Sequence, residues 1–101
     1  MIRARIDRKK GEITVEGHAG AERNAQGHDL VCCAASVLLQ AFLISAVNAG
    51  YRASYDLEPG NSKIHLEEPD RDEGIRARLK MLEDGLCMLE KAYPKCIRVE
   101  R

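Results

Sequence analysis

A long apolar run, residues 30–47, constrains the fold of this chain more than any other feature of its sequence. Three polar side chains interrupt the run, and its length lies at the lower limit for a membrane span, so we expect a buried helix. Asp29 can cap this helix because its carboxylate can accept amide protons two or three residues on, and Gly50 ends it. A helix over residues 29–49 that is apolar nearly all round must be central, with a sheet on one side and a helix or a partner on the other.

Segments in which apolar and polar residues alternate surround this helix. Residues 2–16 alternate on both sides of a Lys-Lys-Gly turn and predict a β-hairpin. Residues 51–66 predict a second hairpin with the sequence Glu-Pro-Gly-Asn at its turn. A short last strand follows near the C-terminus, with Ile97 and Val99 on one face.

Between the second hairpin and the last strand, apolar residues recur at steps of three and four, which is typical of an amphipathic helix. We expect this helix to begin at Pro69 and Asp70, with Asp70 and Glu73 as a capping box, and to end at Pro94. Its expected apolar stripe consists of Ile75, Leu79, Leu82, Leu86, Leu89 and Tyr93. The order β-β-α-β-β-α-β predicts an α+β fold, a small mostly antiparallel sheet with two helices on one face, as a single domain over residues 1–101.

The charge balance narrows the class of partner. Lys and Arg number 16, as do Asp and Glu, so the formal net charge is zero. Proteins that bind nucleic acid mainly through phosphates normally carry a basic excess, so we expect no direct nucleic-acid partner, and no membrane. Charged residues interrupt the N-terminal segment where a signal peptide would be apolar. We therefore expect a cytoplasmic protein whose four cysteines stay reduced.

The stretch between the first hairpin and the central helix brings a histidine close in sequence to two adjacent cysteines. If Asp29 caps the helix, Cys32 lies in its first turn, where unpaired amides and the helix dipole favour negative charge. Such a position lowers the pKa of a thiol, and the thiolate is the nucleophilic form. The same amides could stabilise an oxyanion beside the sulfur. Cys33 lies about 100° further around the helix, so we expect one thiol to face the loop and the other to be structural.

His18 is the candidate base for that thiol. It lies between Gly17 and Gly20, and glycines keep the approach to the imidazole open. A neutral imidazole beside a thiol accepts its proton and activates the cysteine as a nucleophile. The residues leave alternatives: a thiol that only packs, a thiol-redox role, which would prefer Cys-x-x-Cys, and a zinc site that also recruits His28. Adjacent cysteines diverge at the start of a helix, which makes the zinc site the weaker hypothesis.

Two stretches within residues 17–36, Gly-His-Ala-Gly and Gly-His-Asp-Leu-Val-Cys-Cys-Ala-Ala-Ser, resemble the signature of the ribosomal-processing cysteine protease family, Prp. In that family a Gly-His-Ala-Gly stretch precedes Gly-x-Asp-Ile/Leu-Val-Cys-Ala-Ala-x-Ser. The resemblance implies that His18 is the catalytic base and Cys32 the nucleophile. Asp29 and Ser36 match the aspartate and the serine of the motif, and we expect them to support the pair.

The resemblance also implies an activity, a substrate and an assembly. Members of the family remove the N-terminal extension of a large-subunit ribosomal protein, after a short motif that contains adjacent phenylalanines. They are homodimers that need no metal and no organic cofactor. The loop between histidine and cysteine would order around the substrate, so we expect Gly17, Gly20, Gly27 and His28 to form a substrate loop.

The sequence departs from the family pattern at two points. Cys33 stands where the family has alanine, and the loop from His18 to Cys32 is longer than is typical of the family. The alternative function is a non-catalytic, ribosome-associated binding module in which Cys32 merely packs. Loss of peptide cleavage in a Cys32→Ala variant would separate the two.

Overall fold

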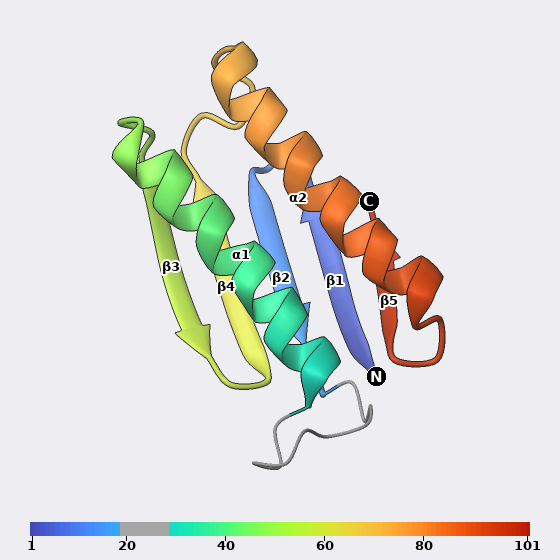
Figure 1. Cartoon of the computed structure of the whole chain (residues 1–101). Coiled ribbons are helices and arrows are strands. Elements are labelled where there is room, and N and C mark those ends of the chain that lie inside the picture. Colours follow the sequence, from blue (N-terminus) through green and yellow to red (C-terminus); the bar gives the residue numbers. More distant parts are fainter. Residues whose placement is uncertain (19–28) are drawn as a thin grey trace.

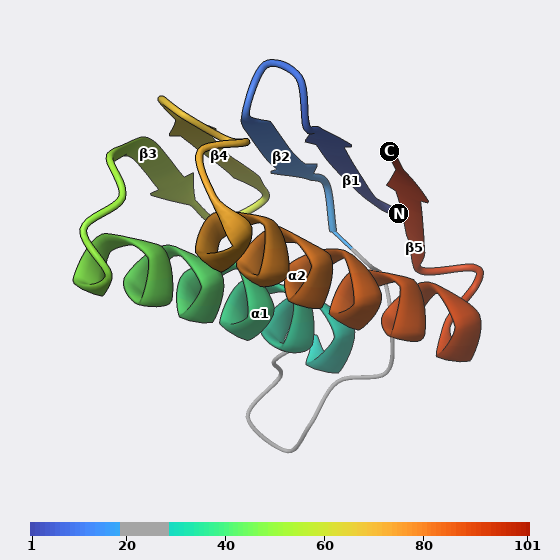
Figure 2. The ribbon, with the colours of Figure 1, turned by 90° about the horizontal axis from the view of Figure 1, so that it is seen from above.

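Two helices cover one face of a five-stranded sheet (Figures 1 and 2) in the part of the chain that the computed structural model describes, residues 1–18 and 29–101. The elements are β1 (Ile2–Asp7), β2 (Glu12–Glu16), α1 (Leu30–Asn48), β3 (Ala53–Glu58), β4 (Asn61–Leu66), α2 (Glu73–Ala92) and β5 (Ile97–Glu100). The strands lie side by side in the order β3-β4-β2-β1-β5. The α+β fold and the element order predicted from the sequence are confirmed.

The sheet is antiparallel except at one edge, where β5 pairs in parallel with β1. The parallel pair follows from the connection, because α2 crosses over the sheet and returns the chain to the side of β1. In β1 the side chains alternate between the buried face, with Ile2, Ala4 and Ile6, and the open face. Both predicted hairpins are present, with β1 paired to β2 and β3 paired to β4.

Helix α1 begins where the sequence indicated. Asp29 has extended backbone angles, and its carboxylate accepts hydrogen bonds from the amides of Val31 at 3.0 Å and Cys32 at 3.1 Å. By length and composition α1 could also cross a membrane, with a mean hydropathy of 2.3 over 18 residues, but the core helix of a soluble protein meets the same criterion. The residues of α1 that are buried are Val31, Ala35, Leu39, Phe42, Leu43 and Ala46.

Helix α2 begins later than the sequence predicted. The cap is Asp72, whose carboxylate accepts from the amide of Ile75, so the predicted start at Pro69 and Asp70 is wrong. The reason is tertiary: the hydroxyl of Tyr51 also donates to Asp72 and holds its carboxylate at the helix start. The exposed Asp70 pairs instead with an arginine of the first turn.

The apolar stripe of α2 packs on the sheet with two differences from the prediction. Tyr93 caps the C-terminus of the helix and is 47% exposed, so it lies outside the core. Glu83 is buried among the leucines, because Arg8 from the β1–β2 turn reaches its carboxylate at 2.7 Å. The ion pair replaces part of the hydration that the buried carboxylate loses.

Three segments that are far apart in the sequence lie at one end of the sheet: the end of β2, the β3–β4 turn and the start of α1. The register of β2 and β4 pairs Glu16 with Asn61, and the next amide, that of Gly17, donates to the carbonyl of Gly60 at 2.9 Å. The residue that follows β2 therefore lies against the β3–β4 turn. The N-terminal turn of α1 lies at the same end of the sheet (Figure 1).

Candidate active site

A cavity of about 540 Å³ lies between the start of α1 and the β3–β4 hairpin. Helix α1 contributes both adjacent cysteines and the polar side chains that follow them at one-turn intervals. The hairpin contributes the facing wall, and apolar side chains of the sheet and of α1 contribute the remainder. The residues that line it include Cys32, Cys33, Ser36, Gln40, His18 and Gly60.

Cys32 is the third residue of α1, as expected from the cap at Asp29. Its side chain is half-buried and packs against the hydrophobic core, while it also lines the cavity. A thiol at this position experiences the positive end of the helix dipole, which favours the thiolate. The neighbouring Val31 is 2% exposed and lies in the core, whereas Cys32 lies at the edge of the core and lines the cavity.

The amides of the first helical turn do not have the role that the sequence suggested. We expected unpaired amides beside the sulfur, but those of Val31 and Cys32 both donate to the carboxylate of Asp29, and the amide of Cys33 donates to its carbonyl at 3.0 Å. The expectation of an oxyanion site from these amides is wrong for this reason. Asp29 is 8% exposed and acts as a helix cap. Its negative charge therefore cancels part of the positive potential at the N-terminus of α1.

His18 lies on the other side of the same cavity. It directly follows the segment that pairs with the β3–β4 turn, and its exposed imidazole lies against Gly60 of that turn. The structure therefore brings His18 and Cys32 to one cavity, although 13 residues separate them along the chain. Of the expected substrate loop, Gly17 lines the cavity, whereas Gly20, Gly27 and His28 lie outside the described residues.

The two cysteines do not divide into one exposed and one structural thiol. Cys33 also lines the cavity and is the more exposed of the two, so the expectation of a structural neighbour is wrong. The core of α1 lies on the side of Val31 and Ala35, and Cys33 is rotated away from it. None of the four cysteines, all of which are described, forms a disulfide with another.

Ser36 lies one turn beyond Cys32 on the cavity wall. Its hydroxyl oxygen accepts a hydrogen bond from the amide nitrogen of the Gln40 side chain at 2.8 Å, which leaves the hydroxyl proton available for a further acceptor. Ser36 was expected near the thiol, whereas Gln40, which extends the polar row of α1 along the cavity, was not predicted from the sequence. The spacing of four residues from Cys32 to Ser36 and again to Gln40 was the signal that could have found it.

The wall opposite α1 was also not predicted from the sequence. This wall is the β3–β4 hairpin and consists of Leu57, Glu58, Pro59, Gly60 and Ser62. The sequence Glu-Pro-Gly-Asn predicted a turn, and the turn is present, but its position beside His18 follows from the pairing of β2 with β4. Local sequence carries no signal for that pairing.

No group of three or more histidine, cysteine or carboxylate side chains with the geometry of a metal site occurs within residues 1–18 and 29–101. Of the expected zinc ligands, His28 lies outside these residues. The remaining cysteines lie on other elements: Cys87 of α2 accepts a hydrogen bond from Arg101 at 3.2 Å, and Cys96 packs against the core.

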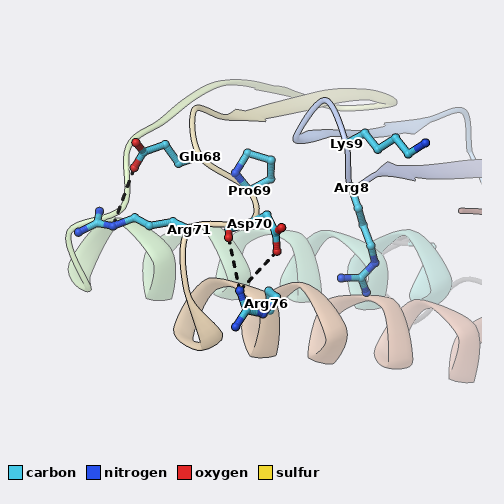
Figure 3. Close-up of a pocket in the computed structure, with 7 residues that line it drawn as sticks. All are labelled: Arg8, Lys9, Glu68, Pro69, Asp70, Arg71 and Arg76. Carbon is cyan, nitrogen blue, oxygen red and sulfur yellow. Dashed lines mark hydrogen bonds and ion pairs between the residues drawn. The ribbon is translucent and has the colours of Figure 1, made fainter.

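A second cavity, of about 650 Å³, lies at the opposite end of the sheet, between the β1–β2 turn and the start of α2. Figure 3 shows that its walls carry ionic side chains that pair with one another, Arg76 with Asp70 at 3.4 Å and Arg71 with Glu68 at 3.9 Å. Among the described residues, no cysteine, histidine or hydroxyl side chain lines it. Of these two cavities, only that of Cys32 carries a thiol and an imidazole among the described residues.

A thiol at the start of a helix and an imidazole on the facing wall of one cavity are the groups of a cysteine protease. The sequence matches the family model of cysteine protease Prp over residues 1–98, and the chain belongs to this family. Family membership favours the protease over the non-catalytic binding module. No curated protein matches the sequence.

Solved structures agree with this assignment. The chain is similar to the essential ribosomal processing protease Prp from S. aureus with a covalently linked product peptide, with a TM-score of 0.82 and 25% identity over 99% of this chain and 98% of that chain. The same protease with a substrate peptide gives a TM-score of 0.76 and 21% identity over 98% and 95% of the two chains. A protein from Streptococcus mutans gives 0.77 and 22% over 99% and 92%. The last two likenesses show the fold.

Proposed function

We propose that this cysteine protease removes the N-terminal extension of a large-subunit ribosomal protein, with the thiolate of Cys32 as nucleophile and His18 as general base. The observation that carries the proposal is the placement of both residues on one cavity, in a chain of the Prp family. The structural relative from S. aureus is a ribosomal processing protease. A ribosomal substrate implies that the reaction takes place in the cytoplasm.

The reaction proceeds in two stages. In the first, the imidazole of His18 takes the proton of the Cys32 thiol, and the sulfur attacks the carbonyl carbon of the scissile peptide bond. The imidazolium then gives its proton to the leaving amine as the C–N bond breaks, which leaves a thioester on Cys32. In the second stage, His18 takes a proton from water, the resulting hydroxide attacks the thioester, and the N-terminal product leaves as a carboxylic acid while the thiol regains its proton. A covalently linked product peptide in the S. aureus relative supports a covalent route.

The shape and lining of the cavity fit an extended peptide with bulky apolar side chains. Its volume of about 540 Å³ exceeds that of a single side chain, and the half-buried Val15 and Leu57 supply apolar surface in the same cavity as Cys32. A motif with adjacent phenylalanines, which the family resemblance implies, would bury one ring on this surface. The polar row of Ser36 and Gln40 on α1 offers hydrogen bonds to the peptide backbone.

A second copy of the chain is the proposed partner of the outer face of α1. Leu30, Val37 and Ile44 are spaced by seven residues, lie on one stripe of the helix and are 50%, 65% and 59% exposed. An apolar stripe of this kind on a charged surface is typical of an interface. An Ile44→Lys variant should sediment as a monomer where the parent sediments as a dimer, and Met81→Lys, at a residue of α2 that is 60% exposed, is the matched control. A parent that is monomeric at micromolar concentration contradicts the dimer.

Cleavage of a peptide tests the catalytic roles. The substrate is a fluorogenic peptide that spans the processing site of the ribosomal protein, and kcat/KM is measured for the parent, Cys32→Ala, His18→Ala and the control Cys87→Ser. Loss of the nucleophile or of the base should lower kcat/KM by roughly 10³-fold or more, whereas Cys87 lies on α2 outside the cavity and its variant should match the parent. Parental cleavage by Cys32→Ala would show that the nucleophile is another group.

A further inference from the structure

We infer that Gly60, in the β3–β4 turn, is a positioning residue that fixes the imidazole of His18 in the active site. The inference rests on the proposed role of His18 as the base. Gly60 is 42 residues from His18 in the sequence. Because glycine has no β-carbon, the imidazole of His18 can occupy the space next to it.

The contact between the ring and the turn is close. A β-carbon built on Gly60 would lie 2.7 Å from Nε2, 3.0 Å from Cε1 and 3.5 Å from Cδ2 of His18. Nε2 is bonded to the other two atoms, so the Nε2 side of the imidazole occupies the space that a β-carbon at residue 60 would need. Ordinary contacts of a β-carbon begin at about 3.4 Å, and any larger residue at this position would therefore push the ring away by at least several tenths of an ångström.

The backbone holds the two residues in this relation. The ladder between β2 and β4 ends with the pair Glu16 and Asn61, and the hydrogen bond from the amide of Gly17 to the carbonyl of Gly60 adds one more link. His18 is the next residue in the chain after Gly17. The hydrogen bond therefore holds the backbone before His18 beside the turn, and Gly60 limits the space that is open to the ring on that side.

Gly60 meets a second requirement that no larger residue meets at the same time. Its φ angle is +76°, in the left-handed region, where L side chains are strained. Asparagine tolerates this backbone conformation better than other residues but carries a β-carbon. The two requirements can therefore be separated by experiment: alanine violates both, and asparagine violates mainly the requirement for space.

The expected effect concerns turnover. Displacement of a catalytic group by about 1 Å can cost roughly 100-fold in rate, and the overlap at Gly60 amounts to less than that, so Gly60→Ala and Gly60→Asn should lower kcat by roughly 10- to 100-fold. KM should change little because the ring is required for proton transfer. Gly50→Ala is the matched control: Gly50 has a φ angle of +90°, and a β-carbon there meets nothing within 4 Å. This control carries the backbone strain without the steric effect on His18.

The experiment combines kinetics on the fluorogenic peptide with NMR of the resting enzyme. Nuclear Overhauser effects between the α-protons of Gly60 and the ring protons of His18 should be present in the parent, and the ring signals should shift in Gly60→Asn but not in Gly50→Ala. Parental kcat and unshifted ring signals in Gly60→Asn would overturn the inference. If His18→Ala cleaves as well as the parent, the proposed catalytic role fails, while the contact between the ring and the glycine is still decided by the NMR spectra.

Discussion

The carboxylate of Asp29 caps α1 and at the same time opposes ionisation of the thiol that follows it. These two effects can be separated, because asparagine caps a helix about as well as aspartate but carries no charge. An Asp29→Asn variant should therefore keep the stability of the parent and lower the pKa of Cys32. An Asp29→Ala variant should lose the hydrogen bonds from the amides of Val31 and Cys32 as well.

The magnitudes follow from the capping geometry. The carboxylate of Asp29 accepts from the amide of Cys32 at 3.1 Å, and the sulfur lies three bonds further along that residue, so the two charges are several ångströms apart. At ~6 Å, two unit charges repel by about 0.7 kcal/mol in water and about 2.8 kcal/mol at the lower effective dielectric near a protein surface. One pKa unit corresponds to about 1.4 kcal/mol, so removal of the charge should lower the pKa of Cys32 by about 0.5 to 2 units. Asp29 is 8% exposed, which favours the upper half of this range. Loss of the cap in Asp29→Ala should cost about 1–2 kcal/mol of unfolding free energy.

The assay is the rate of alkylation of Cys32 by iodoacetamide as a function of pH, with the labelled residue identified by mass spectrometry. A Cys33→Ser background removes the more exposed neighbouring thiol, and urea unfolding of the same proteins gives the stability. In the parent, Cys32 should react well below pH 8.5, the ordinary range of thiol ionisation. An unchanged or raised pKa of Cys32 in Asp29→Asn would refute the electrostatic argument, and an Asp29→Ala protein as stable as the parent would refute the role of the cap.

Three further results are expected from other parts of the fold. Tyr51 donates to Asp72, which raises the pKa of the tyrosine and lowers the pKa of the carboxyl. The pair therefore stabilises the fold fully at a pH above the ordinary carboxyl pKa of 3.8 and below the ordinary tyrosine pKa of 10. This stabilisation is lost as the pH falls through the lowered pKa of Asp72, or as it rises through the raised pKa of Tyr51. The difference in unfolding free energy between the parent and Tyr51→Phe should be largest between these limits, and a difference that does not vary with pH would contradict the coupling. Arg8→Ala should cost about 1–3 kcal/mol in urea unfolding, because it removes the main partner of the buried Glu83. Arg5→Ala breaks an exposed ion pair and should leave stability within experimental error; an equal loss in both variants would show that burial does not set the strength of the Arg8 pair.

Local sequence determined the elements and one half of the site. Alternation of apolar and polar residues predicted both hairpins, because a strand with one buried face has a period of two. The carboxylate of Asp29 before an apolar run predicted where α1 begins and therefore that Cys32 lies in its first turn. These features depend only on residues that are close together in the chain, so they can be predicted from the sequence.

Tertiary contacts decided the remainder. Asp72 and not Asp70 caps α2 because Tyr51, distant in sequence, donates to it, and Glu83 is buried within an apolar stripe because Arg8 reaches it from another turn. The pairing of β2 with β4 in one register places the β3–β4 hairpin on the wall of the cavity that faces α1. The same pairing brings the imidazole of His18 against Gly60. Strand pairing and long-range ion pairs depend on which distant segments meet when the core is buried, so they are fixed by packing of the whole chain and not by any local pattern.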